Sequence, residues 1–265
     1  MSEPASAAAH SQSLERGLAI LAAFRSGRPL LGVSELGREI GLSRSTTHRY
    51  VATLATLGYL RQDHGTKKYR LGPRVLDLGF SAINSMELRE VAAPYLRGLS
   101  DATGFTVNMA ILDGVDIVYV ERCRSTGAGL REVDLNLHVG ARLPAYCTSL
   151  GKVLLAFLPD DERDAALASI AFSRRGPNTI TSRSALAAEL RRVRLDGFAI
   201  NNEELAYGLR SIAAPVLDHD GAAVAAINLA VHSSMVSMQD LAARLSGTLL
   251  RAAADVSAHL GYRPI

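Results

Sequence analysis

The chain is poor in cysteine: 265 residues contain only two, Cys123 and Cys147. They form no close-spaced pair, which excludes a disulfide framework and the common zinc-binding patterns. The seven histidines are scattered, without the i, i+4 or short-loop spacing of a metal site. We therefore predict reduced cysteines, no metal and no cofactor.

Long hydrophobic runs are also missing. No stretch reaches the roughly 18 apolar residues of a membrane-spanning helix, no signal peptide precedes the first predicted helix, and no glycine-rich phosphate loop is present. We expect a cytoplasmic protein without a membrane partner. Its 48% hydrophobic and 21% charged residues are ordinary for a globular protein, and its length suffices for two modest domains.

Positive charge is concentrated near the N-terminus. Up to Gly72 the chain has 10 Lys and Arg against 5 Asp and Glu, whereas the remainder has 19 against 21. A basic excess confined to one region is typical of a segment that binds nucleic acid.

Two short helices joined by a tight turn are predicted within this basic region. Residues 33–40 (VSELGREI) have apolar side chains spaced for one buried face, with Ser34 as the candidate N-cap. Gly41 can end this helix in a left-handed conformation. Ser43 can cap a second helix over residues 44–57. Together they indicate a helix-turn-helix.

The second helix has a basic, hydroxyl-rich side opposite a packing side formed by Thr47, Val51 and Leu54. Hydroxyl and guanidinium groups match the hydrogen-bond acceptors of the DNA major groove. A solvated surface helix is the simpler interpretation of this pattern alone, but the neighbouring elements favour DNA binding.

A β-hairpin is predicted next, with residues 59–61 and 68–71 around the turn Asp63-His64-Gly65-Thr66. This is the wing of a winged helix, whose basic side chains contact phosphates without sequence information. The predicted DNA-binding residues are Ser34, Ser43, Arg44, Ser45, Thr46, His48, Arg49, Tyr50, Arg61, Lys67 and Lys68.

Two further helices flank this unit. Residues 13–24 form the first, with Ser13 as its cap and an apolar stripe, including Leu14 and Leu18, buried against the two helices that follow. Pro73 opens a linker helix that packs on a second copy of the chain. The predicted domains are a winged helix-turn-helix domain at 13–72, the linker helix at 73–86 and a second domain at 87–265.

The second domain combines helices with two β-hairpins. After a helix over 87–101, Asp113-Gly114 and Asp220-Gly221 each lie between two apolar runs, which is a hairpin signal. The strands are predicted at 105–112, 117–121, 212–217 and 224–231, and the further helices at 149–158, 160–169, 182–195 and 237–260. Antiparallel hairpins with helices between and after them imply an α+β sensor-like domain.

The segment 138–152 (HVGARLPAYCTSLGK) is the main candidate for a ligand site. It ends at a helix start, Thr148 or Ser149, where free N–H groups attract an anion. Arg142 offers a bidentate partner for a carboxylate, and Tyr146 offers an aromatic wall.

A facing segment, residues 201–211 (NNEELAYGLRS), supplies a second cation, Arg210. Asn228 is the lone polar residue of the apolar run AAINLAV, and strand interiors rarely hold Asn without a partner. Simpler roles stay open, with Ser149 as a cap only, Arg210 paired with a nearby glutamate and Asn228 facing water.

An enzyme is the alternative. Ser149-Leu150-Gly151-Lys152 matches the Ser-x-x-Lys spacing of penicillin-binding proteins, which would make the chain a serine-dependent hydrolase or acyl-transfer enzyme. Neither Lys-Thr-Gly nor Ser-Asp-Asn accompanies it. We therefore predict no catalytic residue and no enzyme activity.

Four segments in order, SLERGLAIL, the helix-turn-helix with its hairpin, RLPAYCTSLGKVLLA and NNEELAYGLRSIAAPV, resemble the IclR family of bacterial transcriptional regulators. The resemblance implies a winged helix-turn-helix domain, a linker helix and a GAF-like effector-binding domain with an antiparallel sheet. It also implies a homodimer or dimer of dimers on a double-stranded DNA operator.

Residues 142–156 are most similar to the branch that governs the β-ketoadipate pathway, whose effectors are protocatechuate, 4-hydroxybenzoate, β-ketoadipate or related acids. The expected effector is therefore a small aromatic or dicarboxylic acid. A family member that responds to glyoxylate and pyruvate has an acidic residue where Asn201 stands, which favours a different acid here.

The family's effector contacts carry over to Ser149, Leu150, Asn201, Ser211 and Asn228. With the residues chosen on chemical grounds, the predicted effector-binding set is Arg142, Tyr146, Thr148, Ser149, Leu150, Asn201, Leu209, Arg210, Ser211 and Asn228.

Overall fold

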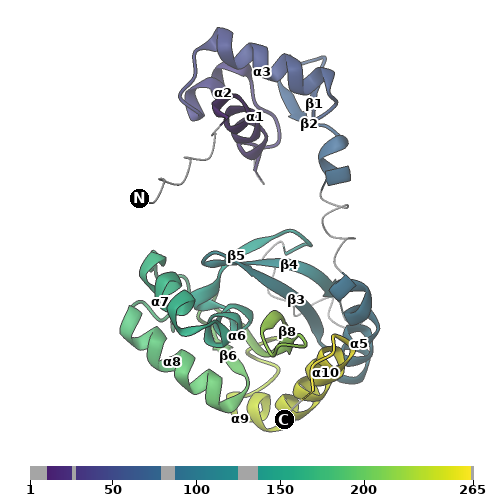
Figure 1. Ribbon diagram of the computed structural model, residues 1–265, viewed down its shortest axis with the longest axis vertical. Coiled ribbons are helices and arrows are strands. Elements are labelled where there is room, and N and C mark those ends of the chain that lie inside the picture. The colour runs from purple at the N-terminus through teal and green to yellow at the C-terminus, as the bar shows by residue number, and fades with distance from the viewer. Residues whose placement is uncertain (1–10, 26–27, 79–86, 125–136, 264–265) are drawn as a thin grey trace, which may run out of the picture. The chain divides into compact units, whose positions relative to one another are not determined.

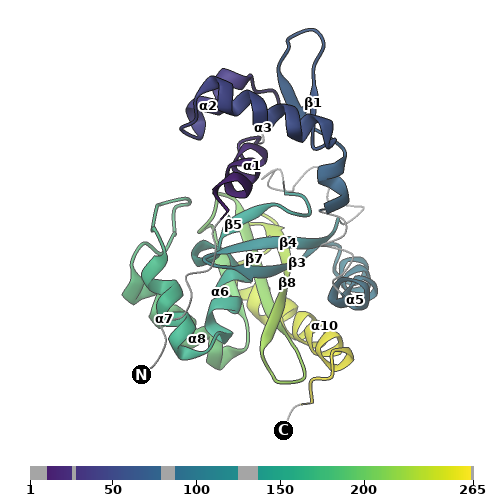
Figure 2. The ribbon, with the colours of Figure 1, turned by 45° about the horizontal axis from the view of Figure 1, so that its top comes forward.

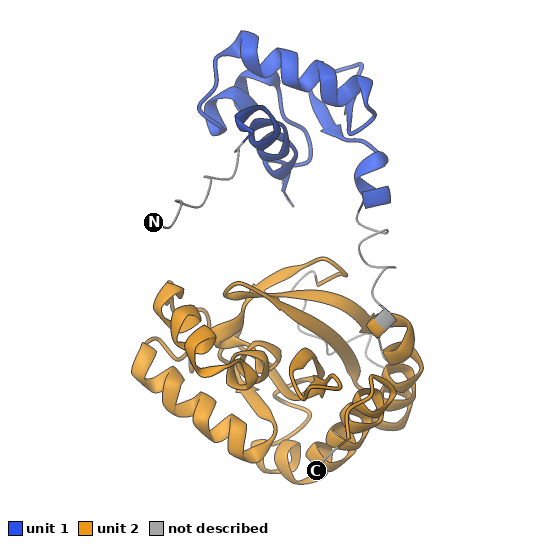
Figure 3. Cartoon of the chain, viewed as in Figure 1, with its two compact units in different colours: residues 1–85 blue, residues 86–265 orange. Residues whose placement is uncertain are grey.

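The computed structural model describes residues 11–25, 28–78, 87–124 and 137–263. The chain forms two compact units, residues 1–85 and 86–265, drawn in two colours in Figure 3. Of the predicted linker helix at 73–86, residues 74–78 are helical and residues 79–86 lie outside the described residues. The domain limits at 72 and 86 therefore stay predictions.

The N-terminal unit is a winged helix-turn-helix, as predicted (Figure 1). Its core contains Ile20, Leu36, Val51 and Leu60, one or more from each helix and from the hairpin. Its elements are α1 (Gln12–Ala22), α2 (Val33–Glu39), α3 (Arg44–Thr56), β1 (Leu60–Gln62) and β2 (Tyr69–Leu71), the two strands being antiparallel.

The turn between α2 and α3 depends on two glycines. Gly41 has a φ of +69°, a conformation that costs glycine little. A Cβ on Gly37 would lie 2.9 Å from both the Leu42 carbonyl oxygen and Thr47 Oγ1, so only glycine permits this close approach. Ser43 then caps α3, because its hydroxyl accepts a hydrogen bond from the Thr46 N–H at 3.2 Å.

Three local predictions in this unit were wrong. Ser11, rather than Ser13, caps α1. The carboxylate of Glu35, rather than Ser34, satisfies the start of α2, where it accepts the Gly32 N–H at 2.6 Å. The N-terminal part of the α1 stripe is not buried, since Leu14 is 63% and Leu18 57% exposed. Ile20 and Leu21, near the end of the helix, do pack in the core.

The C-terminal unit is built on a six-stranded antiparallel sheet of order β5-β4-β3-β8-β7-β6. The two predicted hairpins are the neighbouring pairs β3–β4 and β7–β8, and the α+β class is confirmed. The strands are β3 (Thr106–Asp113), β4 (Asp116–Cys123), β5 (Arg142–Pro144), β6 (Ala199–Asn202), β7 (Leu209–Leu217) and β8 (Ala223–His232).

Helices cover both faces of this sheet, and Figure 2 shows α7 and α8 across the sheet from α5. One core lies under α6, α7 and α8, and the second lies under α5 and α10. The helices are α5 (Glu87–Thr103), α6 (Ser149–Phe157), α7 (Asp160–Ser169), α8 (Arg183–Asp196), α9 (Met238–Asp240) and α10 (Ser246–His259).

The closing helix, predicted as one piece over 237–260, contains a π-helical turn at Leu241–Leu245 between α9 and α10. Leu241 and Leu249 are both fully buried. In a regular α-helix they would point about 80° apart, and the extra residue of the π turn brings them to the same side. Within the described residues, no helix is long and apolar enough to cross a membrane.

A bulge in the first hairpin changes which side chains face α6. Asn108 lies opposite Arg122 and Met109 opposite Glu121, but Ala110 lies opposite Tyr119, so Val120 is an extra residue. Strict alternation puts residues three apart on opposite faces. Because of the bulge, Tyr119 and Arg122 share the α6 face.

Candidate functional site

The N-terminal unit presents basic and hydroxyl side chains on the exposed side of α3. Thr47 and Val51 are buried, and the opposite side is open to solvent. The predicted residues on or before this helix that are exposed are Ser43, Arg44, Ser45, His48 and Arg49. Thr46 is half-buried, and Tyr50 packs against the core, with the guanidinium of Arg49 6.0 Å from its ring centre.

A surface hollow of about 450 Å³ lies where α2, α3 and the hairpin meet. Predicted DNA-binding residues from all three elements line it, namely Ser34, Arg44, His48, Lys67 and Lys68. Arg61 is exposed on β1, opposite Arg70 on β2. The structure therefore groups donors from three separate segments around one concave surface.

Lys68 is less available than the other predicted cations. Its Nζ lies 3.2 Å from the Glu35 carboxylate. Hydrogen bonds from the Gly32 N–H and from Lys68 lower the pKa of Glu35, which keeps the carboxylate charged. The ion pair holds the hairpin against the start of α2, and it neutralises part of the charge predicted to face phosphates.

The C-terminal unit encloses a small cavity at the start of α6, which we call the α6 cavity. Its volume is about 20 Å³, room for about one water molecule. Ten of the described residues, from the sheet, the α6 start and two connecting segments, line it: Asn108, Tyr119, Leu137, Thr148, Asn201, Leu205, Leu209, Ser211, Asn228 and Ala230.

Glycine at one position sets how α6 begins. A Cβ on Gly151 would lie 2.3 Å from the Ala145 Cα, so any larger residue would push α6 off the turn before it. Thr148 caps the helix by accepting the Gly151 N–H at 3.1 Å. The N–H groups of Ser149 and Leu150 belong to the first turn, where no carbonyl of the helix can reach them.

Half of the predicted effector-binding residues line the α6 cavity: Thr148, Asn201, Leu209, Ser211 and Asn228. Ser149 is buried beside it, with its Oγ 2.7 Å from the Ser211 Oγ. Asn201 is held in place because its Nδ2 donates to the Cys147 carbonyl and its Oδ1 accepts the Glu204 N–H.

The two predicted cations do not line the cavity. Arg142 pairs with the Asp113 carboxylate at 2.7 Å, on the edge of the sheet. Arg210 donates to Asn202 Oδ1 and to the carbonyls of Ser233 and Val236. Each guanidinium already has oxygen acceptors within its own fold, and a role for either arginine as the partner of a ligand carboxylate stays a prediction.

The other two members of the predicted set have packing roles. Tyr146 is buried, and its hydroxyl donates to the Ser173 carbonyl at 2.7 Å. Leu150 is fully buried in the core under α6. Neither lines the α6 cavity.

Sequence reasoning missed five lining residues, of which Asn108 and Tyr119 are the polar ones. Asn108 is a lone amide within the apolar run TVNMAIL. Like Asn228, it is an amide in a strand interior, where Asn rarely lies without a partner. The two amides are bonded to each other, since Asn108 Nδ2 donates to Asn228 Oδ1 at 2.9 Å.

The geometry gives no support to a serine-dependent enzyme. Lys152 is 1% exposed, and its Nζ lies 2.6 Å from Glu204 and 3.2 Å from Glu189. The Lys152 Nζ contacts these two carboxylates and the Ile200 carbonyl, whereas the Ser149 Oγ contacts the Ser211 Oγ. Burial raises the pKa of Cys147 to about 12, which removes the thiolate nucleophile at neutral pH.

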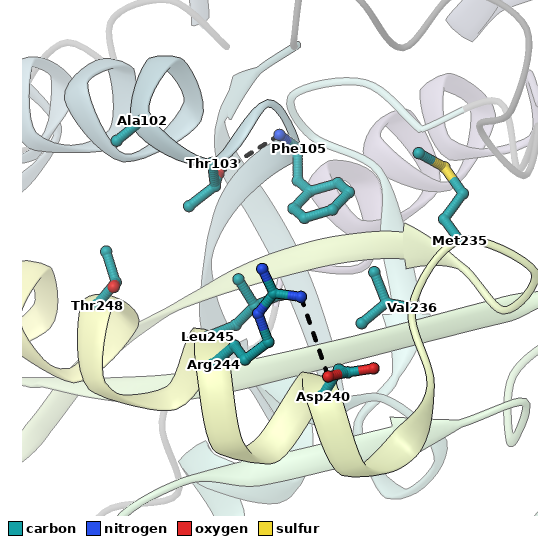
Figure 4. Close-up of a pocket in the computed structure, with 9 residues that line it drawn as sticks. All are labelled: Ala102, Thr103, Phe105, Met235, Val236, Asp240, Arg244, Leu245 and Thr248. Atoms are coloured by element: carbon teal, nitrogen blue, oxygen red, sulfur yellow. Dashed lines mark hydrogen bonds and ion pairs between the residues drawn. The ribbon is translucent and has the colours of Figure 1, made fainter.

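A larger hollow, of about 510 Å³, lies on the other side of the sheet between the end of α5 and the α9–α10 segment. Figure 4 shows Arg244 and Asp240 pointing toward one another there, with the Phe105 ring facing them. The two charges are 4.0 Å apart and largely exposed. This hollow lacks the set of buried polar groups that converges on the α6 cavity.

A basic winged helix-turn-helix followed in the same chain by a separate unit, with a small cavity partly lined by polar side chains, defines a class of protein, the DNA-binding transcriptional regulators. Two family models match the chain. The IclR helix-turn-helix domain matches residues 13–64, and the bacterial transcriptional regulator IclR C-terminal domain matches residues 80–258. The chain therefore belongs to the IclR family.

Curated relatives share about a third of their residues with this chain. The HTH-type transcriptional regulator XynR of Escherichia coli (strain K12) is 35% identical, over 95% of this chain and 98% of the relative. The Pca regulon regulatory protein of Pseudomonas putida is 36% identical, over 92% and 82%. The p-hydroxybenzoate hydroxylase transcriptional activator of Acinetobacter baylyi is 35% identical, over 86% and 84%.

Solved structures agree on the fold. A transcriptional regulator from Rhodococcus sp. RHA1 matches with a TM-score of 0.81 and 40% identity, over 95% of this chain and 98% of that one. An IclR homologue from Microbacterium hydrocarbonoxydans, solved in complex with 4-hydroxybenzoate, matches with a TM-score of 0.80 and 25% identity, over 94% and 99%.

Proposed function

We propose that this regulator binds its operator under the control of a small organic acid, of the aromatic or β-ketoadipate class, held in the α6 cavity. The observation that carries the proposal is the cavity itself, where Thr148, Asn201, Ser211 and Asn228 converge on a helix N-terminus. Buried sites with a few convergent polar groups are where small ligands bind.

The start of α6 supplies the attraction for an anion. The first-turn N–H groups of Ser149 and Leu150 lie at the positive end of the helix dipole. Both residues are fully buried, so a carboxylate there would be shielded from water. Because Arg142 and Arg210 are paired elsewhere, neutral donors and the helix dipole bind the acid, without an ion pair to either arginine.

The size of the cavity links binding to a change of structure. A benzoate ring is many times larger than the one water that about 20 Å³ accommodates. Binding must therefore displace apolar wall residues such as Leu137, Leu205 or Leu209. A ligand that fits only the expanded arrangement shifts the population toward it. Such coupling is typically worth roughly 1 to 3 kcal/mol, or 5- to 150-fold in operator affinity.

The relatives support the class of acid. One is named for the Pca regulon, one for p-hydroxybenzoate hydroxylase, and one solved homologue holds 4-hydroxybenzoate. XynR is as similar to this chain as these relatives are. The effector therefore has to be identified by testing a panel of acids. 4-Hydroxybenzoate, protocatechuate and β-ketoadipate are the first probes, and a ligand at about 100 times its Kd should stabilise the protein by roughly 2.7 kcal/mol.

The test combines this panel with DNA binding and a blocked cavity. Anisotropy measures the affinity for DNA from upstream of the chain's own coding region, with and without each acid. Ser211→Leu should abolish the response by filling the cavity, whereas Arg142→Gln should keep it, because Arg142 lies on the exposed sheet edge. An undiminished response in Ser211→Leu, or none of the acids acting on the parent chain, would refute the proposed site.

We also propose that the working form is a homodimer. Leu14 and Leu18 are exposed one turn apart on α1, and Leu76 and Leu78 are exposed after the hairpin, at 59% and 56%. Exposed leucines gathered in one small unit are typical of an interface with a partner. A twofold dimer carries two DNA-binding faces and suits a palindromic operator.

Sedimentation equilibrium tests the dimer. The pair of changes Leu14→Glu and Leu18→Glu should lower the mass toward that of one chain and weaken operator binding, because the two half-sites are no longer bound together. Leu195→Glu is the matched control, since Leu195 is 86% exposed on the C-terminal unit and should leave the mass unchanged. A monomeric parent chain would contradict the proposal.

A further inference from the structure

Three polar side chains cross the α6 face of the sheet in one row. Arg122 on β4 lies directly opposite Asn108 on β3, and Asn108 lies directly opposite Asn228 on β8. Directly opposite residues share a face of the sheet and lie within reach of each other. Asn108 is 1% and Asn228 4% exposed, and both line the α6 cavity.

Hydrogen bonds give this row a direction. An Arg122 guanidinium N–H donates to Asn108 Oδ1 at 3.0 Å, and Asn108 Nδ2 donates to Asn228 Oδ1 at 2.9 Å. A guanidinium has only donors, so Asn108 must turn its oxygen toward Arg122 and its NH2 group toward Asn228. Asn228 then uses its oxygen on Asn108, and its own NH2 group remains for the cavity.

Tyr119 adds a second donor to the same wall. The bulge at Val120 turns Tyr119 to the α6 face, where it lines the cavity at 4% exposure. Burial raises the pKa of Tyr119 to about 12, so the phenol stays protonated. Its hydroxyl can therefore offer a hydrogen to a ligand group in the cavity.

We propose that Arg122 is a positioning residue that makes the sheet wall of the α6 cavity a donor surface, with the Asn228 NH2 group and the Tyr119 hydroxyl as the groups that bind the effector's oxygen atoms. The inference rests on the proposed function and specifies its chemistry. The wall suits a carboxylate, whose two oxygen atoms both accept hydrogen bonds. The primary amide of the same shape is disfavoured, because its NH2 group cannot bond to the Asn228 NH2 group and is left with the Tyr119 hydroxyl, which can also accept.

The sharpest test reverses the direction of the hydrogen bond between residue 108 and Asn228. In Asn108→Asp both side-chain oxygens accept, one from Arg122 and one from Asn228. Asn228 must then turn its NH2 group away from the cavity and present its oxygen. Calorimetry with 4-hydroxybenzoate and 4-hydroxybenzamide measures the preference for acid over amide. We expect Asn108→Asp to reduce that preference roughly 10- to 100-fold.

The change in affinity for the amide distinguishes a reversed Asn228 from the effect of the added negative charge. An added negative charge repels the acid but has little effect on the neutral amide, whereas a reversed Asn228 binds the amide more tightly than the parent does. Arg122→Lys keeps a cationic donor and should retain the parent's preference within about threefold. Tyr119→Phe removes one donor and should weaken acid binding roughly 3- to 10-fold.

The outcomes separate this inference from the site proposal. If Ser211→Leu abolishes acid binding but a folded Asn108→Asp keeps the parent's acid-to-amide ratio, the donor wall is wrong and the cavity stands. If Ser211→Leu leaves acid binding intact, the cavity is wrong and the donor wall falls with it. Should Asn108→Asp fail to fold, an unchanged acid affinity in Tyr119→Phe overturns the inference.

Discussion

The two units of this chain use positive charge in opposite ways. In the N-terminal unit Arg44, Arg49 and Arg61 are exposed on or beside the helix-turn-helix. In the C-terminal unit Arg210 and Lys152 are held by acceptors within the fold. The first arrangement leaves cations in water for an incoming polyanion, and the second uses them to fix segments around a cavity.

This difference teaches that a cation near a predicted anion site need not bind the anion. A surface guanidinium costs little to leave unpaired, because water solvates it. A buried one must have partners inside the fold. The charge that attracts DNA is therefore displayed, while the effector meets neutral donors and a helix dipole.

Removing the most deeply buried cation should have the largest effect. Lys152→Ala leaves the carboxylates of Glu204 and Glu189 without their ammonium, and losing one partner of a buried ion pair costs roughly 3 to 5 kcal/mol. Urea denaturation followed by circular dichroism measures the free energy of unfolding. Lys67→Ala, an exposed lysine in the other unit, should stay within about 0.5 kcal/mol of the parent.

The loss should also depend on pH. Burial raises the pKa of Glu204, and removing Lys152 takes away the main group that lowers it. A carboxyl group with a raised pKa in the folded state stabilises the fold when protonated, and this contribution is lost as the pH rises through that pKa. Lys152→Ala should therefore be closer to the parent at pH 5 than at pH 8. An equal loss at both would mean that Glu204 does not take up the proton.

A smaller effect is expected for a displayed cation that contacts a base. Arg49→Ala should weaken operator binding by roughly 1 to 3 kcal/mol and leave binding to scrambled DNA nearly unchanged. Anisotropy on both duplexes measures the two affinities. An equal loss on both would assign Arg49 to the phosphate backbone, and no loss would remove it from the interface.

The smallest expected effect is on the salt dependence of DNA binding, and it differs between two cations of the hairpin. Arg61→Ala should reduce the salt dependence of DNA binding by about one unit of slope, as expected for one phosphate contact. Lys68→Ala should reduce it by less, because Lys68 is shared with Glu35. Titrations at several salt concentrations measure both slopes. A larger change for Lys68 would show that DNA displaces Glu35 from the pair.

Much of the fold followed from local patterns. Gly41 and Ser43 mark the turn and the cap of α3, and Asp113-Gly114 and Asp220-Gly221 mark two hairpins, because these residues act on the backbone within a few positions of themselves. The α6 start was predictable for the same reason. Local signals also identified Thr148 and Asn228 among the residues that line the α6 cavity, whereas Asn201 and Ser211 came from the family resemblance.

What the local patterns missed depends on partners far along the chain. Leu14 and Leu18 have the spacing of a buried stripe, but the direction in which α1 turns is set by α2, α3 and the hairpin. Arg142 and Arg210 suit a carboxylate by chemistry, yet their acceptors, such as Asp113 and Ser233, are brought to them by strand pairing.

The residue order alone determined that a basic winged helix-turn-helix precedes an α+β unit, because capping, turn and periodicity signals act over a few residues. Tertiary structure decided which polar groups meet in the α6 cavity. One inserted residue, Val120, turns Tyr119 to the same face as Arg122, and strand register places Asn108 between Arg122 and Asn228. Register is a property of paired strands, which no single stretch of sequence contains.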